Sequence, residues 1–264
     1  MQFIEYKKHI ICYNWYNLDF NKSLREFIEA KRYIEILDSM KSNTILVLGG
    51  DWAMLTAIKN HYDKGYPFLW INFWRKGFLL NNREYLSEKI EYIERTYPLL
   101  EIQTETDWST IKEVAMNEID IRAWAWKMIW LDFSLSKNQK LCIEWDWVII
   151  STPAGSTGYN SSLWGPIIPH IIDAFVITPK ASWKPKFQPA IIVDNREFIE
   201  VINNWRKNPV EIYCDWRLFL STEKNTQISL KIKKSLHSVK LIIINDYIDI
   251  WDNKVLQEQW FEIV

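Results

Sequence analysis

The clearest structural signal in the sequence lies in Thr44–Trp52, which reads TILVLGGDW. An apolar run rich in branched side chains, ended by Gly49 and Gly50, is typical of a buried strand of a parallel sheet. Ala53–Tyr62 then places apolar residues at helical spacing, and Phe68–Ile71 resumes a strand. This order predicts a β-α-β unit.

The sequence changes character near residue 98. Arg83–Tyr97 predicts an amphipathic helix that Pro98 would end. Beyond it we expect short strands at Leu141–Ile143, Val148–Ile150, Phe175–Ile177, Ala190–Val193, Phe198–Ile202, Val210–Tyr213, Ile228–Ile232 and Val239–Ile244. The predicted fold is an α/β domain over residues 1–98 and an all-β domain over residues 99–264, with the tail 254–264 packing back on one of them.

The composition is that of a globular protein, with 48% hydrophobic and 25% charged residues among 264. A formal net charge of −1 provides no broad field for binding nucleic acid or an anionic membrane, so we expect neither partner. The N-terminus lacks the continuous apolar stretch of a secretion signal, and we expect a cytoplasmic protein. The four His and three Cys lack ligand spacing, so no protein-ligated metal is expected.

The tryptophan content is anomalous, with 16 Trp against 7 Gly. An average protein contains about 7% glycine. Several Trp occupy turn positions beside Asp, as in Asp51-Trp52, Trp145-Asp146-Trp147 and Asp215-Trp216, where a residue without a β-carbon is the usual choice. We infer that many or all of these positions are glycine in the working protein, because UGA codons that the organism reads as Gly were translated as Trp. A Trp-rich core is the alternative.

The turn Gly49-Gly50-Asp51 has a composition suited to phosphoryl chemistry. A glycine-rich turn brings main-chain N–H groups close to phosphate oxygens, and the following helix offers its positive end. A carboxylate beside that position can accept the proton of an acceptor hydroxyl, so Asp51 is a candidate base. Many α/β proteins have such a turn for steric reasons only.

A second motif is more specific. Ser151–Asn160 reads STPAGSTGYN and follows the predicted strand Val148–Ile150. Small hydroxyls, two glycines and a tyrosine in one loop supply hydrogen-bond donors and a stacking surface, which a dinucleotide requires. An ordinary surface loop of this composition is the alternative.

Gly49-Gly50-Asp51, Asn117-Glu118, Asp146 and Thr152–Tyr159 occur in the order found in NAD kinases, and the chain resembles that family over most of its length. Further similar segments are Leu69–Leu79, Trp164–Pro166 and Thr178-Pro179. The family pattern has glycine at seven positions that are Trp here: Trp52, Trp70, Trp74, Trp145, Trp147, Trp164 and Trp216. The resemblance therefore supports the recoding hypothesis independently of composition.

The resemblance implies a role for each motif. Asp51 would be the base that acts on the adenosine ribose 2′-hydroxyl of NAD, and Gly49 and Gly50 would bind phosphate. The residues expected to contact NAD are Trp52 (as glycine), Phe78, Asn117, Glu118, Asp146, Thr157, Gly158, Tyr159 and Ser162. The family usually has Ala where Gly158 stands, a small change that should leave binding intact.

The implied activity is that of an NAD kinase with the two-domain fold of the family, making NADP from NAD. The phosphoryl donor would be ATP, arriving with Mg²⁺, or polyphosphate, and the enzyme would be a homo-dimer or homo-tetramer. Two alternatives remain: a related lipid kinase that shares the Gly-Gly-Asp turn, and a non-catalytic nucleotide-binding protein if the Trp residues are real, because an indole at position 52 would obstruct the phosphates.

Overall fold

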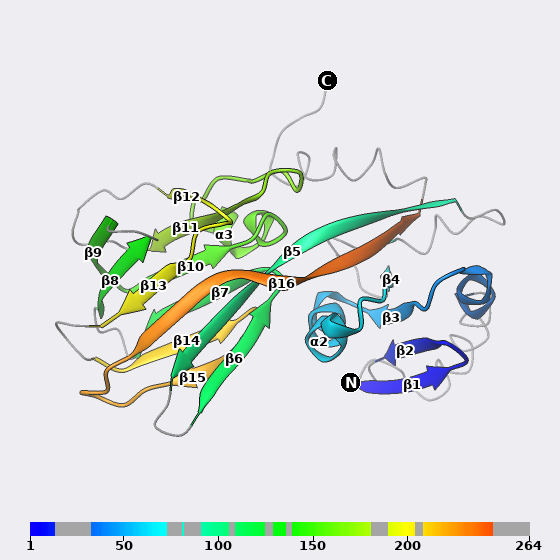
Figure 1. Cartoon of the computed structure of the whole chain (residues 1–264), viewed down its shortest axis with the longest axis horizontal. Coiled ribbons are helices and arrows are strands. Elements are labelled where there is room, and N and C mark those ends of the chain that lie inside the picture. Colours follow the sequence, from blue (N-terminus) through cyan, green and yellow to red (C-terminus); the bar gives the residue numbers. More distant parts are fainter. Residues whose placement is uncertain are drawn as a thin grey trace. The chain divides into compact units, whose positions relative to one another are not determined.

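The structure of the protein is a computed structural model (Figure 1), and it describes residues 1–13, 33–72, 81, 91–105, 109–124, 129–135, 139–180, 190–203 and 208–244. The chain forms two compact units. The first comprises Met1–Thr96 and Ser238–Val264, and the second comprises Tyr97–His237.

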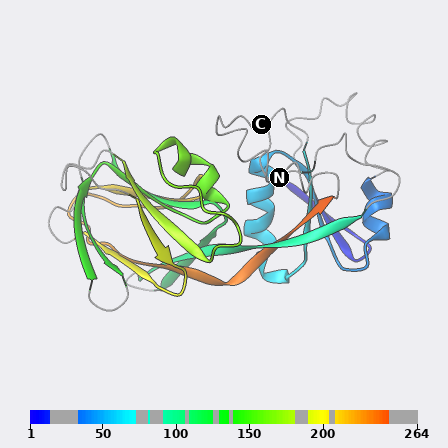
Figure 2. The same ribbon diagram turned by 90° about the horizontal axis from the view of Figure 1, so that it is seen from above.

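The first unit contains the predicted β-α-β arrangement. Strand β3 (Ile45–Gly49) leads into helix α2 (Asp51–His61), a short 3-10 turn η2 (Tyr62–Lys64) follows, and strand β4 (Phe68–Asn72) runs parallel to β3. Figure 2 shows α2 beside these strands. The pattern of apolar residues in Thr44–Phe68 thus predicted the correct elements, because each strand is buried by its neighbours in a parallel sheet.

The remaining elements of this unit complete the sheet. Strands β1 (Gln2–Tyr6) and β2 (His9–Tyr13) form an antiparallel hairpin, and β2 also pairs in parallel with β3. A helix spans residues 33–39. The apolar core gathers side chains from this helix and the sheet: Tyr33, Ile36, Leu37, Met40, Leu46, Leu69, Ile71, Ile242 and Ile244.

Two long strands, β5 (Tyr92–Glu105) and β16 (Ser229–Ile244), run side by side in Figures 1 and 2 and contribute residues to both units. The helix predicted for Arg83–Tyr97 is wrong over residues 92–97, which belong to β5; residues 83–90 lie outside the described residues. Pairing with β16 and complete burial of Tyr97 outweigh the helical spacing of the apolar residues. The two strands predicted within 228–244 are one strand.

The second unit is built from strands packed face to face. Six strands form one antiparallel sheet in the order β12 (Ile191–Asp194), β11 (Ala174–Lys180), β10 (Trp147–Ser151), β7 (Glu118–Ala123), β14 (Val210–Cys214) and β15 (Arg217–Ser221). The opposing layer contains β6 (Thr110–Ala115), β8 (Ile129–Leu135), β9 (Gln139–Trp145) and β13 (Ile199–Ile202), with β5 and β16.

An apolar core lies between these layers, and Ile119, Val148, Phe175 and Leu230 belong to it. Alternate residues of each strand point to opposite faces. Thus Ile119 and Ile121 of β7 enter the core, which leaves Glu118, Asp120 and Arg122 on the other face.

The fold is therefore an α/β part followed by an all-β part, as predicted. The compact units differ from the predicted domains 1–98 and 99–264 in the position of residues 238–244, where β16 pairs with β4. The functional assignment of those domains stays a prediction.

Candidate active site

The glycine turn of the first unit is sterically tight. A β-carbon on Gly49 would lie 2.6 Å from the Ala53 β-carbon, closer than real β-carbons approach. Gly50 is the N-cap of α2, and its carbonyl accepts the N–H groups of Ala53 at 2.9 Å and Met54 at 3.3 Å. The turn therefore requires glycine at position 49. The N-terminus of the 11-residue helix α2, which carries a partial positive charge, follows directly and favours the binding of anions.

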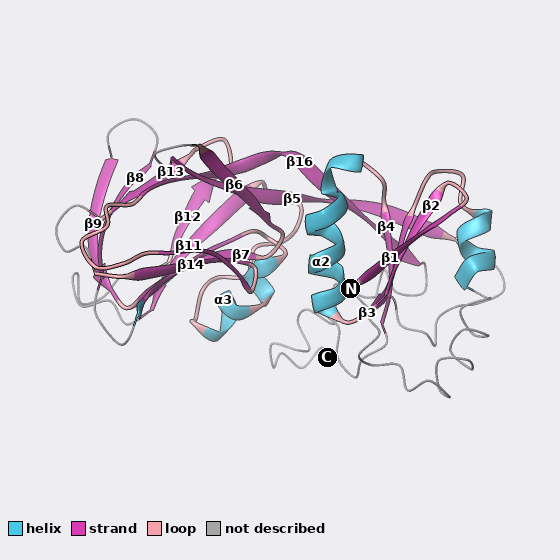
Figure 3. Ribbon diagram, turned by 90° about the horizontal axis from the view of Figure 1, so that it is seen from below, coloured by secondary structure: helices cyan, strands magenta, loops and turns pink. Residues whose placement is uncertain are grey.

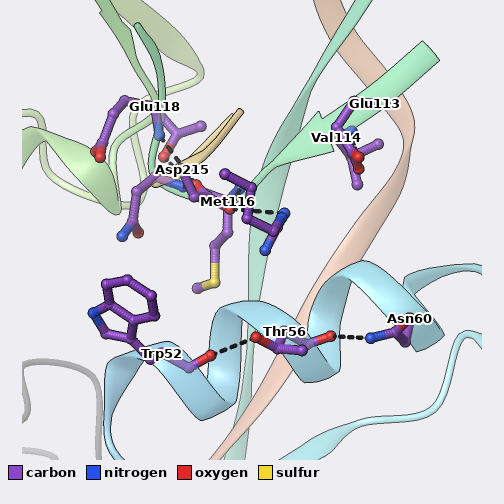
Figure 4. Close-up of polar contacts among 11 residues, drawn as sticks. Trp52, Thr56, Asn60, Glu113, Val114, Met116, Glu118 and Asp215 are labelled. Atoms are coloured by element: carbon purple, nitrogen blue, oxygen red, sulfur yellow. Dashed lines mark hydrogen bonds and ion pairs between the residues drawn. The ribbon is translucent and has the colours of Figure 1, made fainter. Parts of the chain in front are cut away.

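Asp51 and Trp52 are the first two residues of α2, and both are exposed. The Trp52 carbonyl accepts the Thr56 hydroxyl at 2.8 Å, and the Thr56 carbonyl accepts the Asn60 side-chain amide at 2.7 Å (Figure 4). The Trp52 side chain is 61% exposed. The helix is thus regular through position 52, while the indole is not part of an apolar core.

In the second unit, the turn containing Asn117 lies against the loop that follows β10. A β-carbon on Gly155 would overlap the main-chain oxygen of Asn117 and lie 2.5 Å from its carbonyl carbon. The same oxygen accepts the Thr152 N–H at 2.9 Å, and the Thr152 hydroxyl donates to the Met116 carbonyl at 2.6 Å. Two of the predicted motifs, Asn117-Glu118 and the Thr152–Tyr159 loop, are therefore joined by main-chain contacts.

This junction connects segments that are well separated in the sequence. Met116 and Thr152, which share a buried hydrogen bond, are 36 positions apart. The contact brings Asn117 and Glu118 next to the start of the Thr152–Tyr159 motif.

The rest of that loop is held by buried polar contacts. The Asn160 amide donates to the carbonyls of Ser156 at 3.1 Å and Pro166 at 3.0 Å, and its oxygen accepts the Thr178 hydroxyl at 2.6 Å. A 3-10 turn, η5 (Gly155–Thr157), and the short helix α3 (Tyr159–Ser162) lie beside the sheet that contains β7 (Figure 3). Gly158, Tyr159 and Ser162 are exposed, and Thr157 is half-buried. The hydrogen bonds of Asn160 hold the backbone of this loop in place, and the predicted contact residues belong to it.

Asp146 lies at the opposite end of β10 from Thr152, in the turn between β9 and β10, where it is exposed. Its neighbour Trp147 reaches back to the loop, because the Trp147 and Tyr159 rings are 5.0 Å apart. The predicted residues of the second unit thus lie along the length of β10, about 13 Å for five residues. An elongated ligand fits this arrangement better than a compact one.

Among the predicted residues, Glu118 has a strongly perturbed electrostatic environment. Its Oε2 atom is buried and has no hydrogen-bond partner among the described residues. Burial raises the pKa of Glu118 well above its usual value, and the negative charges of Asp215 and Asp120 raise it further, against the opposing effect of Arg122. A buried carboxyl oxygen without a partner marks a place where a ligand group can bind.

A polar cluster beside Trp147 was not predicted from the sequence. Asp120 Oδ2 accepts Arg122 Nη2 at 2.6 Å, and Asp120 Oδ1 accepts the Trp147 indole N–H at 3.0 Å. The Arg122 guanidinium lies over the rings of Trp147 at 4.1 Å and Tyr213 at 4.5 Å. Burial raises the pKa of Asp120, although Arg122 and Trp147 oppose that rise. The alternation of Glu118, Asp120 and Arg122 along one strand was the signal for this shared face.

Phe78 lies outside the described residues, so its predicted contact stays a prediction. Within the described ranges, no three His, Cys, Asp or Glu side chains gather as metal ligands would. Also within those ranges, no helix has both the length and the apolar character needed to cross a bilayer.

Comparison with known proteins matches residues 87–244 to the ATP-NAD kinase C-terminal domain. The NAD kinase of Brucella suis is 27% identical over 245 residues, which cover 89% of this chain and 91% of that protein. The NAD kinase of Flavobacterium johnsoniae is 33% identical over 213 residues, covering 76% of this chain and 70% of that protein.

Two solved structures share the fold. A yeast NADH kinase complexed with NADH aligns with a TM-score of 0.75 at 16% identity, covering 97% of this chain and 88% of that one. An NAD kinase from Archaeoglobus fulgidus in complex with ATP aligns with a TM-score of 0.66 at 19% identity, covering 93% and 97%. The fold and the family match together define the protein as a kinase. The chain belongs to the NAD kinase family.

Proposed function

We propose that the protein transfers the γ-phosphoryl group of ATP to the 2′-hydroxyl of the adenosine ribose of NAD, giving NADP. The names of the Brucella and Flavobacterium relatives support NAD as the acceptor, and the solved neighbours were crystallised with NADH and with ATP. The observation that carries the proposal is the contact of Asn117 with Gly155, which joins the predicted Asn117-Glu118 motif to the Thr152–Tyr159 loop.

The chemistry of these residues suits the parts of NAD. Asn117 and Glu118 offer an amide and a carboxyl group for the base and sugar of one nucleoside. Asp146, Thr157, Gly158, Tyr159 and Ser162 would line the site along β10, where Tyr159 supplies a stacking surface. Phe78 and position 52 are also proposed as NAD contacts.

The reaction needs a base and an anion site. The 2′-oxygen attacks the γ-phosphorus, its proton passes to the Asp51 carboxylate, and the bond from the γ-phosphorus to the bridging oxygen breaks as ADP leaves. The N–H groups at the start of α2, after Gly49 and Gly50, would bind phosphate oxygens. Mg²⁺ would enter as part of the ATP substrate, bound to the phosphates.

Several further features are proposed from the family alone. Polyphosphate is the alternative donor, the enzyme would act in the cytoplasm, and a homo-dimer or homo-tetramer would complete the NAD site. Activity that is unchanged on dilution to a monomer would contradict the last point.

We also propose that glycine replaces Trp at turn positions of the working protein. Trp164 supports this most directly, because its φ is 62° and its side chain is 96% exposed. A bulky residue rarely adopts a positive φ, and a fully exposed indole gains no stabilisation from burial of its apolar surface. Trp52, 61% exposed beside Asp51, is the functionally important case.

Two other Trp positions are packed instead. Trp70 is 3% exposed, and its indole N–H donates to the Gly49 carbonyl at 3.1 Å. Trp147 lies between Arg122, Tyr159 and Lys180. For these positions the proposal rests on the family pattern, and glycine at 147 would open space for a substrate ring beside Tyr159.

The test is to express the chain once as written and once with Gly at Trp52, Trp70, Trp74, Trp145, Trp147, Trp164 and Trp216, and to assay NADP formation with ATP and with polyphosphate. We expect NADP from the glycine form only. NADP formation by the chain as written, with Trp at these positions, would overturn the recoding proposal. If a long-chain alcohol is phosphorylated and NAD is not, the protein is a lipid kinase; if neither form turns over but nucleotide binds, it is a binding protein.

The codons provide an independent check. UGG rather than UGA codons at Trp52, Trp145 and Trp147 would rule out recoding at those positions. Mass spectrometry of peptides from the native organism identifies the residue directly.

A further inference from the structure

Asp215 is a buried carboxylate that has no role in the predicted site. It lies in the turn between β14 and β15, is 3% exposed, and has a φ of 53°. Aspartate tolerates this backbone better than most residues, but burial of its charge is costly without compensating contacts.

The compensating contacts come from the turn between β6 and β7. Asp215 Oδ1 accepts the Asn117 N–H at 2.7 Å and the Glu118 N–H at 3.4 Å, and Oδ2 accepts the Met116 N–H at 3.3 Å (Figure 4). The Asp215 N–H donates to the Glu118 carbonyl at 2.8 Å. Arg217 Nη2 lies 3.6 Å from Oδ2 and balances the charge. One side chain therefore holds three consecutive main-chain N–H groups.

The position of Asp215 follows from the strand register. Cys214 of β14 pairs with Ile119 of β7, so Asp215 stands opposite Glu118, at the point where the ladder ends. The Asp215 carboxylate thus supplies hydrogen-bond acceptors to the end of the turn between β6 and β7, beyond the last residue pair of the β7–β14 ladder. Burial raises the pKa of Asp215 to about 6, while hydrogen bonds from the N–H groups of residues 116–118 and the charge of Arg217 oppose that rise because they stabilise the ionised carboxylate.

We propose that Asp215 is a positioning residue, which holds Asn117 and Glu118 in the orientation in which they contact NAD. The inference rests on the proposed function, since the NAD contacts of Asn117 and Glu118 belong to it. Asp215 itself is not proposed to touch NAD. Its effect should therefore fall on NAD binding rather than on the phosphoryl transfer step.

Two variants, Asp215→Asn and Asp215→Gly, test this in the glycine form of the protein, which serves as the parent. Asn and Gly are chosen because both accept a positive φ. We expect the KM for NAD to rise about tenfold or more, since hydrogen bonds to a charged group are lost, while kcat and the KM for ATP change less. Amide hydrogen exchange at residues 116–118 should accelerate in both variants. Asp194→Asn is the matched control, because Asp194 accepts the Arg196 N–H at 2.9 Å in another turn of the same unit.

The outcomes separate the inference from the proposed function. If the parent protein forms NADP but the variants retain its KM for NAD, Asp215 is not a positioning residue. Unchanged exchange at residues 116–118 would also refute the proposal, and this readout does not need activity. If the parent protein forms no NADP, the proposed function fails, whatever the exchange data show. A kcat loss with an unchanged KM would indicate a merely structural role and would overturn the inference.

Discussion

The main-chain oxygen of Asn117 lies against Gly155 so closely that a β-carbon at residue 155 would overlap it. The Thr152 N–H bonds to the same oxygen at 2.9 Å, which fixes the separation of the two segments. Residue 155 must therefore be glycine for reasons of space rather than of backbone conformation.

Gly155→Ala should consequently loosen this junction. We expect a loss of about 1–3 kcal/mol in the free energy of unfolding, typical of overpacking, and a higher KM for NAD. Denaturant unfolding and steady-state kinetics measure the two effects.

The control for this change is Gly65→Ala in the first unit. Gly65 has a φ of 67° and no neighbour within 4 Å of an added β-carbon, so the substitution should cost about 1–2 kcal/mol through backbone strain alone. Its KM for NAD should stay at the parent value. Equal KM values for the two variants would show that the junction does not shape the NAD site.

Asp51→Asn should separate binding from turnover. The amide keeps the size of the side chain but cannot accept the hydroxyl proton, so we expect kcat to fall by about 100- to 10,000-fold. NAD affinity, measured by calorimetry, should change little. Asp63→Asn makes the same charge change at another exposed position of the first unit and is the control. Full turnover in Asp51→Asn would exclude Asp51 as the base.

Glu118→Gln should make stability less dependent on pH. The folded-state pKa of Glu118 is raised from 4.5, so the wild-type side chain contributes fully to stability below that value and loses its contribution as the pH rises through the folded pKa. A tenfold change in the acid dissociation constant corresponds to about 1.4 kcal/mol. Unfolding free energies of the two proteins should agree near pH 4 and diverge in favour of the variant at higher pH.

Glu223→Gln, at an exposed carboxyl, is the control for that series. A constant difference between Glu118→Gln and the wild type at every pH would show that burial does not govern the titration of Glu118.

Trp164→Gly should stabilise the protein, although it removes a large side chain. The positive φ costs an L-residue about 1–2 kcal/mol, and a side chain that is 96% exposed loses almost no packing when it is removed. Leu236→Gly is the matched control, because Leu236 is also 96% exposed but lies in β16. Glycine should destabilise that strand by about 0.5–1 kcal/mol. Thermal unfolding of both variants measures the contrast, and destabilisation by Trp164→Gly would count against glycine as the native residue there.

The sequence by itself determined the β-α-β unit, the glycine turn and the β-rich remainder of the chain. These features depend on local patterns: a buried parallel strand is continuously apolar, and a helix repeats its apolar residues every three or four positions. The family motifs were recognisable for the same reason, since each is a short continuous segment. The helical spacing of apolar residues gave a wrong prediction for residues 92–97, because pairing with β16 makes this segment a strand.

Only the tertiary structure decided which segments meet. Asp215 binds the N–H of Asn117 across 98 residues of sequence, and Gly155 packs on the same turn. No periodicity records such a contact, because it depends on strand register and on the space left between two turns. The Glu118 oxygen that has no hydrogen-bond partner in the described part of the chain, and the raised pKa of that carboxyl group, likewise follow from the folded surroundings, which bury it near the charge of Asp215.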